Sequence, residues 1–367
     1  MQIRKSGAKY SAIVGIGEKI RKQSLETGEE YLLLNRGVNA VCHIELDSII
    51  KDIDFNSKAM QVYPPSQGRQ ELRQAINNHY FDNKTSLSNI SICGGGMSAL
   101  DLAFQTLDVE QILLPEFYWG SYFQVMTIRD IQSGSYNNFD KLLSRLDEIK
   151  NSAVIICDPN NPIGNKIADE ELLKTVNILN DNGTTVIIDC PYRRIFCDKE
   201  DTFFQSLLNF ENVIIVESFS KSIGLSGQRL GFIHSTNTDF NTELGIRLMY
   251  ATNGINAFSQ ILVTNILETE KGKQSRKQFK ETTVKGISRN IEYLNKKGLL
   301  ASEFYKESKA IGIFVVVNKS EEELLEKKIG SVSLSYFTKT KKDEASKYAR
   351  ICVSVPSDKF ENYFKEF

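Results

Sequence analysis

Lys221 is the residue of this chain best placed to do chemistry, because it directly follows an apolar, β-branched run at residues 213–216. The surrounding segment, residues 218–231, reads SFSKSIGLSGQRLG, with hydroxyls before the lysine and glycines after it. This pattern predicts a buried strand ending in a loop whose glycines allow positive φ and close backbone approach. Burial and the neighbouring cation Arg229 would lower the pKa of the Lys221 amine, which turns a lysine into a Schiff-base nucleophile.

Two further loops have the composition of turns or anion sites. The stretch CGGGMSAL, residues 93–100, follows a predicted strand and opens a helix, where backbone N–H groups and glycines can hold a phosphate. A tight turn alone would also need glycine, and the G-x-G-x-x-G pattern of dinucleotide sites is absent. The stretch DPNNPIG, residues 158–164, also follows an apolar run and is suited to a turn.

Two charged residues border apolar runs. Asp189 ends the run 184–188, where a carboxylate is costly to bury unless it meets a cation; a helix N-cap is the ordinary alternative. Arg350 precedes the run 351–355, and an arginine at the edge of a strand is usually solvated. The cluster FYWGSY at residues 117–122 contains the only tryptophan and would by default pack in a core.

The elements that must position these groups alternate along the chain. Strands are predicted at residues 31–35, 90–93, 111–114, 127–131, 153–157, 184–189, 213–217 and 230–234. Helices fall between several of them, for instance at 169–181, whose apolar residues lie on one face. This order predicts an α/β fold with a mostly parallel central sheet, helices on both faces, and the site at the carboxyl ends of the strands.

A long helical stretch from residue 256 to about 297 is predicted to link to a smaller α/β unit. Its predicted strands are 311–317, 332–334 and 351–355, and its helices are 321–328 and one after 357. We therefore expect a large domain at 45–259 and a small domain formed by 1–44, with an N-terminal arm, and 260–367.

Composition excludes several classes of protein. The 45 Lys and Arg residues balance 46 Asp and Glu residues, which argues against nucleic-acid or membrane partners. No run is long enough to span a bilayer, and no N-terminal apolar region of the kind found in secretion signals is seen. Six cysteines without C-x-x-C spacing favour reduced thiols in a cytoplasmic protein. None of the three histidines is paired at metal-ligand spacing, so no metal is expected.

The lysine segment has the pattern S-x-S-K-x-x-G-L-x-G-x-R-x-G. It resembles the cofactor-lysine segment of fold-type I pyridoxal-phosphate enzymes, the aminotransferase class I/II family. The resemblance implies that Lys221 forms an aldimine with pyridoxal 5'-phosphate, and that Ser218 and Arg229 hold the cofactor phosphate.

Other segments resemble the parts of this family that bind the cofactor. The glycine turn is similar to its first phosphate-binding turn, which implies main-chain contacts from Gly95, Gly96 and Met97. The spacing P-x-x-x-W-x-x-Y implies that Trp119 stacks on the cofactor ring, with Tyr118 as the alternative. In N-P-x-G, the resemblance implies that Asn161 donates to the ring oxygen. In D-x-x-Y, it implies that Asp189 pairs with the pyridinium nitrogen and Tyr192 bonds the ring oxygen.

The resemblance also implies substrate and subunit contacts. R-I-C-V-S-V is similar to the family strand whose arginine forks onto the substrate α-carboxylate. The implied substrate-binding residues are Arg350, Gly37 and Asn161. Val38 and Asn39 depart from the acidic residue and proline of many relatives. Tyr63 matches a tyrosine that reaches the phosphate of the partner subunit, which implies a homodimer with shared active sites.

The combined segments predict an aminotransferase that moves an amino group between an L-amino acid and a 2-oxo acid. The catalytic residues would be Lys221, as general base and acid, with Asp189 and Tyr192. The C-terminal RICVSVPSDKFENYF is similar to the histidinol-phosphate aminotransferase branch. The same fold also supports other bond cleavages, so a pyridoxal-phosphate lyase or decarboxylase is the alternative. A non-catalytic binding or regulatory protein with the same fold is a third hypothesis.

Overall fold

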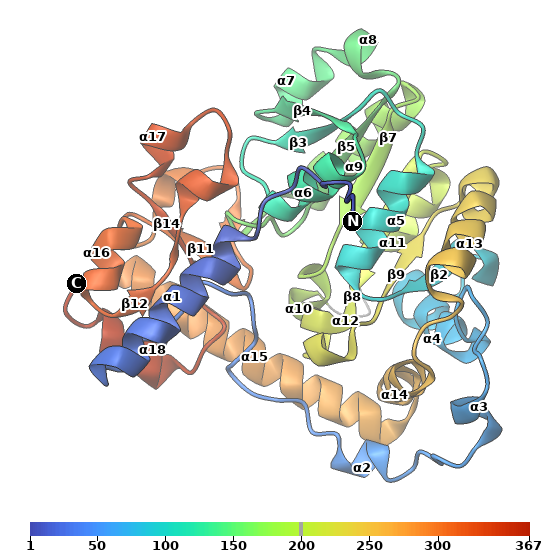
Figure 1. Cartoon of the computed structure of the whole chain (residues 1–367), viewed down its shortest axis with the longest axis horizontal. Coiled ribbons are helices and arrows are strands. Elements are labelled where there is room, and N and C mark those ends of the chain that lie inside the picture. Colours follow the sequence, from blue (N-terminus) through green and yellow to red (C-terminus); the bar gives the residue numbers. More distant parts are fainter. Residues whose placement is uncertain (198–200) are drawn as a thin grey trace.

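A computed structural model describes residues 1–197 and 201–367, and its centre is a seven-stranded sheet (Figure 1). The strand order is β2-β9-β8-β7-β5-β3-β4. The strands are β2 (Ile90–Cys93), β3 (Gln111–Pro115), β4 (Gln132–Tyr136), β5 (Ser152–Cys157), β7 (Thr185–Asp189), β8 (Val213–Ser218) and β9 (Gly231–His234). Only β9 runs antiparallel to its neighbours, β2 and β8. The predicted mostly parallel α/β sheet is therefore confirmed.

Helices cover both faces because successive side chains of each strand point to opposite sides. In β7, Val186 and Ile188 pack into one core, and Ile187 packs into the other. The first core contains side chains from α4 (Gln70–Phe81), α9 (Asp169–Asp181) and α14 (Ala257–Glu268). The second contains side chains from α5 (Gly96–Thr106), α6 (Gly120–Ile128) and α13 (Thr238–Thr252). Burial on both faces explains why these strands read as continuous apolar runs.

A smaller unit lies beside this sheet and has its own core. Its antiparallel sheet has the order β11 (Phe314–Val317), β14 (Ala349–Cys352), β13 (Val332–Ser333), and β1 (Leu32–Leu33) pairs with β12 (Ile329–Gly330). The helices α1 (Ala12–Thr27), α16 (Glu321–Glu326), α17 (Lys342–Ala345) and α18 (Ser357–Phe364) complete it. The helix α15 (Glu270–Lys296) connects the two parts, and the boundaries expected at residues 45 and 260 stay a prediction.

One predicted strand was wrong, and one predicted helical stretch has a break within it. The strand expected at 127–131 is the end of α6 and a turn, because Tyr122, Val125 and Met126 lie on the buried face of that helix. The true strand, β4, is the polar edge strand that follows. The helical stretch expected from residue 256 to about 297 is confirmed, and it is divided into two helices, α14 and α15. They meet closely, since a Cβ on Gly272 would lie 2.2 Å from the carbonyl oxygen of Asn265.

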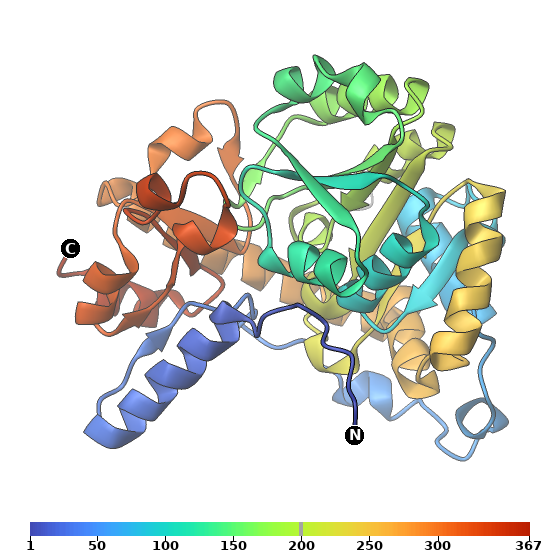
Figure 2. The ribbon, with the colours of Figure 1, turned by 45° about the horizontal axis from the view of Figure 1, so that its top comes forward.

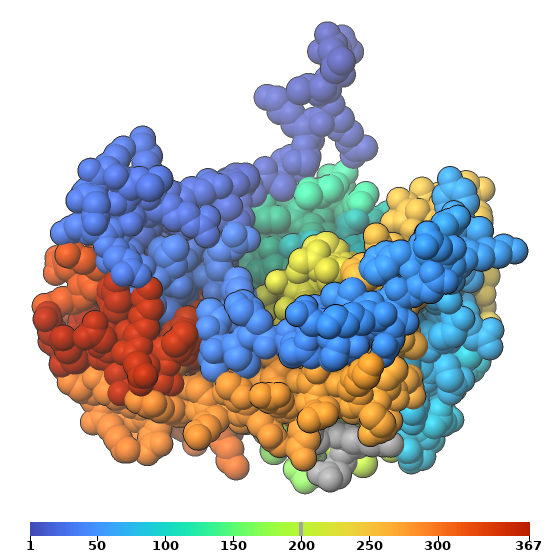
Figure 3. All heavy atoms as spheres, turned by 90° about the horizontal axis from the view of Figure 1, so that it is seen from below, coloured from blue at the N-terminus to red at the C-terminus, as the bar shows by residue number. Residues whose placement is uncertain are grey.

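The N-terminal segment bridges the two parts of the molecule (Figure 2). The backbone N–H of Lys9 donates to Gln124 Oε1 on α6 at 2.7 Å, whereas α1 follows on the side of the smaller unit. On another face, α2 (Asp47–Ile50) lies against α14 and α15 (Figure 3). No helix in the described ranges is both long and apolar enough to cross a membrane.

Candidate active site

A cleft of about 630 Å³ lies between the carboxyl ends of the parallel strands and the smaller unit. Parallel pairing brings these ends together, because Cys157 at the end of β5 is opposite Asp189 at the end of β7. The predicted site residues that line the cleft are Gly37, Gly96, Met97, Trp119, Asn161, Asp189, Tyr192, Ser218, Lys221, Arg229 and Arg350. Residues from positions 37 to 350 therefore meet at one place.

Lys221 lies one turn beyond the end of β8, in the short helix α12 (Phe219–Ser222). Ser218 caps this helix, with its hydroxyl accepting the backbone N–H of Ser220 at 3.3 Å. Lys221 Nζ donates to the carbonyl oxygen of Gly37 across the cleft. Burial lowers the pKa of the Lys221 amine, and the nearby charge of Arg229 acts in the same direction. The amine is thus positioned and biased toward its nucleophilic, neutral form.

A concave anion site forms where α5 begins. A Cβ on Gly95, whose φ is +88°, would lie 2.8 Å from Arg229 Nη2. A Cβ on Gly96 would lie 3.3 Å from the Cβ of Ser218. Side chains at either glycine would therefore fill the space between the helix N-terminus and these groups. Arg229 Nη1 donates to the carbonyl oxygen of Ser226 at 2.9 Å, which fixes the guanidinium. A phosphate group fits this arrangement of N–H groups, hydroxyl and cation.

Asp189 is a buried carboxyl at the floor of the cleft, with an exposed fraction of 4%. Burial raises its pKa to about 7, although the hydroxyl of Tyr122, which donates to Asp189 Oδ2, opposes the shift. Within the described ranges, Tyr122 is its only side-chain hydrogen-bond partner. A protonated ring nitrogen facing the cleft would supply the missing positive charge. Sequence analysis missed Tyr122, although it is the last residue of the aromatic spacing.

Asn161, Tyr192 and Arg350 form a connected group at the other side of the cleft. Asn161 Nδ2 donates to the hydroxyl of Tyr192 at 3.2 Å, and Arg350 Nη1 donates to Asn161 Oδ1 at 3.1 Å. Arg350 Nη2 donates to the carbonyl oxygen of Asn35, a contact that no sequence pattern indicated. Arg350 precedes the predicted run as expected, but it is a fully enclosed member of β14 rather than a solvated edge residue.

The Arg350 guanidinium lies 4.0 Å from the ring centroid of Phe314 and 4.7 Å from that of Phe337. Burial lowers its pKa to about 10. Its Nε is buried with no hydrogen-bond partner among the residues that the structure describes. Two aromatic rings thus fix the plane of the Arg350 guanidinium in the cleft, and its Nε–H can still donate a hydrogen bond to a ligand.

The structure separates the two candidates for the stacking residue. Trp119 lines the cleft, with its ring edge-on to Tyr122 at 5.5 Å between centroids. Tyr118 is buried outside the cleft lining, where its backbone N–H donates to the carbonyl oxygen of Phe337. Of the two candidates, Trp119 is the one that lines the cleft, and its contact with a cofactor ring stays a prediction.

Three other positions that the sequence singled out are Tyr63, for which a contact with a partner subunit stays a prediction, and Val38 and Asn39. Tyr63 is 83% exposed in a surface hollow formed by residues 60–64 and 254–257, outside the cleft. Val38 lines the cleft, but Asn39 is turned toward α15, where its Nδ2 donates to Thr283 Oγ1 at 2.7 Å. Asn39 therefore ties the N-terminal segment to the long helix.

Comparison with known proteins shows that the chain is similar to aminotransferases. The family described as "Aminotransferase class I and II" matches residues 30–366. The aspartate aminotransferase of Pyrococcus horikoshii is 27% identical over 237 residues, 60% of this chain and 59% of that relative. The histidinol-phosphate aminotransferase of Sulfurovum sp. is 29% identical over 194 residues, 50% of this chain and 52% of that relative. The chain thus spans about half the length of these curated relatives, or slightly more.

The likeness in fold extends over the entire chain. The Thermus thermophilus aspartate aminotransferase with maleate has a TM-score of 0.83 to it, covering 100% of this chain and 99% of that one at 16% identity. An aminotransferase from Mycobacterium tuberculosis gives the same TM-score of 0.83 and covers 97% of its own chain. The chain has the fold of these proteins, that of fold-type I pyridoxal-phosphate enzymes. Since the family match includes both the lysine loop and the Arg350 strand, we conclude that this chain belongs to the aminotransferase class I and II family.

Proposed function

We propose that this protein is a pyridoxal 5'-phosphate-dependent aminotransferase that transfers an amino group between an L-amino acid and a 2-oxo acid. The observation that carries the proposal is the convergence of Lys221, Asp189 and Arg350 on one cleft. The names of the relatives, aspartate and histidinol-phosphate aminotransferases, support the reaction class.

The residues of the cleft fit the cofactor group by group. The glycine turn with Ser218 and Arg229 would hold the phosphate, Asp189 would pair with the ring nitrogen, and Trp119 would contact the ring face. Asn161 and Tyr192 would donate to the ring oxygen. When bound, pyridoxal phosphate supplies an electron sink for the negative charge that develops at the substrate Cα.

The chain's own groups account for substrate binding and proton transfer. Arg350, held between two aromatic rings, is oriented to bind the substrate α-carboxylate through charge-assisted hydrogen bonds. Lys221 Nζ, whose pKa burial lowers, then takes the proton from the substrate Cα as a general base. The carbonyl oxygen of Gly37, which accepts a hydrogen bond from Nζ, would hold the amine on the substrate side of the cleft.

Visible absorption of the cofactor-loaded protein tests the reaction. Each L-amino acid is added in turn, followed by 2-oxoglutarate or pyruvate. We expect one amino acid to bleach the visible band and an oxo acid to restore it. Consumption of an amino acid while the band persists would instead indicate a lyase or decarboxylase. The matched control is Lys221→Ala, which should bind phosphate compounds but show no turnover; full activity in this variant would refute the mechanism.

We also propose that the protein works as a cytoplasmic homodimer. Tyr63 is exposed beside the exposed Val62, and this apolar pair suits a contact with a second subunit. All six cysteines are free thiols, which supports a reducing compartment. Light scattering should give twice the chain mass, and Tyr63→Asp should reduce it to one chain. A wild-type protein that is monomeric at micromolar concentration would contradict this proposal.

A further inference from the structure

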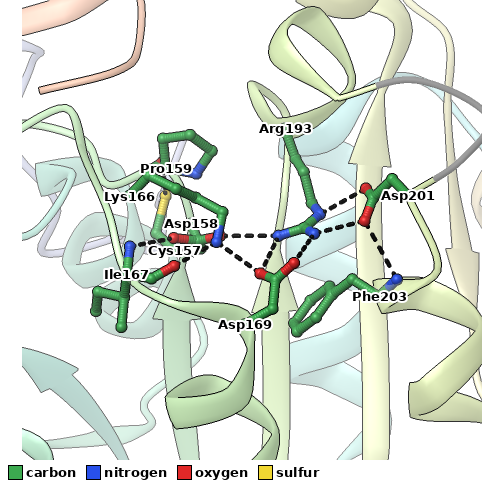
Figure 4. Close-up of polar contacts among 9 residues, drawn as sticks. All are labelled: Cys157, Asp158, Pro159, Lys166, Ile167, Asp169, Arg193, Asp201 and Phe203. Carbon is green, nitrogen blue, oxygen red and sulfur yellow. Dashed lines mark hydrogen bonds and ion pairs between the residues drawn. The ribbon is translucent and has the colours of Figure 1, made fainter. Parts of the chain in front are cut away.

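Five charged side chains of the described residues form a cluster centred on Arg193, which directly follows the cleft residue Tyr192 (Figure 4). We call it the Arg193 cluster; its members are Arg193, Asp158, Lys166, Asp169 and Asp201. The Arg193 side chain is 1% exposed and contacts all three carboxylates, with the Phe203 ring 4.1 Å from its guanidinium carbon. Among the residues that the structure describes, three carboxylates thus meet two cations in this cluster.

The contacts of Arg193 with its three partners differ in geometry. Asp201 receives two bonds, from Nε at 2.8 Å and Nη2 at 2.6 Å, and Asp169 also receives two, at 2.9 and 2.7 Å. Asp158 receives a single bond from Nη1 at 3.1 Å, and its second cation is Lys166 at 3.0 Å. Measured by contact geometry alone, Asp158 is the weakest of the three partners.

Asp158 and Arg193 are nevertheless the two members of the cluster that are closest in the chain to the cleft residues Asn161 and Tyr192. Asp158 directly follows β5 and begins the turn that carries Asn161, whereas Arg193 directly follows Tyr192 and begins α10 (Arg193–Phe196). Asn161 and Tyr192 are themselves joined by the 3.2 Å hydrogen bond in the cleft. These four residues therefore form a closed ring of links. The polypeptide chain joins Asp158 to Asn161 and Tyr192 to Arg193. Hydrogen bonds join Asn161 to Tyr192 and Arg193 to Asp158.

Stability alone does not account for such a ring. Desolvation of two charges often offsets their attraction, and apolar side chains of similar size would pack such a site as well. What a buried ion pair provides in addition is a fixed geometry, because any other arrangement would leave a charge unpaired. In this ring the geometry that is fixed is the spacing of the Asn161 amide and the Tyr192 hydroxyl.

We propose that Arg193 is a positioning residue, which through Asp158 holds the Asn161 turn against Tyr192 and so sets the hydrogen bonds offered to the cofactor ring oxygen. This inference rests on the proposed function for its chemistry, although the ring of contacts itself is independent of it. If the contact between Arg193 and Asp158 is lost, the hydrogen bonds that Asn161 and Tyr192 donate to the oxygen of the cofactor become weaker. The ring oxygen would then keep more of its negative charge, so a proton on the Lys221 nitrogen beside it in the loaded protein would be retained to higher pH.

Two matched variants test the proposal, Asp158→Asn and Asp201→Asn. Each removes one negative charge that touches Arg193 and leaves two carboxylates with two cations, but only position 158 lies on the Asn161 turn. We expect Asp158→Asn to move the pH midpoint of the visible cofactor band upward by about half a unit or more, and Asp201→Asn to leave it unchanged. A purely structural role predicts the opposite ranking, because Asp201 has the stronger contact. Equal midpoints in both variants and wild type would overturn the proposal.

A second measurement on the cofactor-free protein keeps this inference separate from the proposed function. Hydrogen–deuterium exchange is followed in the turn at residues 158–164. Faster exchange there in Asp158→Asn than in Asp201→Asn supports the positioning role, and equal exchange overturns it. A wild-type protein that shows no visible band with pyridoxal phosphate would refute the proposed function, and the exchange comparison would still decide the role of Arg193.

Discussion

The buried carboxyl of Asp189 should make the stability of the cofactor-free protein depend on pH. Its pKa in the folded chain is about 7, against 3.8 for an unperturbed carboxyl. The folded state therefore binds the proton more tightly, so the free energy of unfolding falls as pH rises from about 4 and the loss is complete above about 7. The difference of about 3 pKa units corresponds to about 4 kcal/mol at 1.36 kcal/mol per unit.

Asp189→Asn removes this titration while keeping the shape of the side chain and an oxygen for the Tyr122 hydroxyl. We expect the cofactor-free variant to be more stable than the cofactor-free wild type, and the difference to grow by about 3 kcal/mol between pH 5 and pH 8. Urea unfolding of both proteins, stripped of cofactor, at half-unit pH steps measures it. Asp108→Asn, a change at an exposed carboxyl, is the matched control and should show no such growth.

Cofactor binding should reverse the order. With a positively charged ring nitrogen beside it, the Asp189 carboxylate gains the partner it lacks, so the loaded wild type should be more stable than the loaded variant. A difference between the cofactor-free proteins that stays flat from pH 5 to pH 8 would refute the reasoning, because it would mean that water or another group already solvates this carboxyl.

Three further predictions concern single contacts of the cleft. Tyr122→Phe removes the hydrogen bond that lowers the pKa of Asp189, so the pH-dependent loss of stability in the cofactor-free protein should extend above pH 7, as the same urea series would show. Arg350→Lys loses one charge-assisted hydrogen bond to the α-carboxylate, worth about 1.5–3 kcal/mol, and should raise KM for every amino donor about 10- to 150-fold; an unchanged KM in steady-state kinetics would contradict that role. Arg229→Gln should weaken binding of pyridoxal phosphate at least about 10-fold in an absorbance titration and leave binding of phosphate-free pyridoxal unchanged.

The sequence predicted the floor of the cleft because that part follows from local patterns. Cys157, Asp189 and Ser218 each end an apolar run, and in parallel strands such ends must lie at one edge of the sheet. The strand at 127–131 was predicted wrongly for a related reason. Its apolar residues fit a buried strand and a short amphipathic helix equally well, whereas the real edge strand, β4, is polar and carries no such signal.

Contacts between distant segments had no local signal. The hydroxyl of Tyr122 reaches Asp189 from a helix on one face of the sheet, and Arg350 bonds the carbonyl oxygen of Asn35 from 315 positions away. Such pairs depend on how the two parts of the molecule pack. The antiparallel direction of β9 could not be predicted either, because the direction of a strand is set by the connection that precedes it rather than by its own residues. The sites and roles carried over by resemblance stay predictions until the variants above are measured.

The position of β2 has a consequence for how the chain matures as it leaves the ribosome. β2 is the first strand of the seven-stranded sheet to be synthesised, yet among the described strands its only neighbour is β9, which begins at Gly231, 138 residues after β2 ends at Cys93. Until β9 emerges, β2 has no strand partner, and the glycine turn that follows it has no Arg229 to face. Closure of the sheet edge and completion of the anion site are therefore one event. A nascent chain should gain affinity for a phosphate-bearing cofactor only once residues 229–234 have left the exit tunnel.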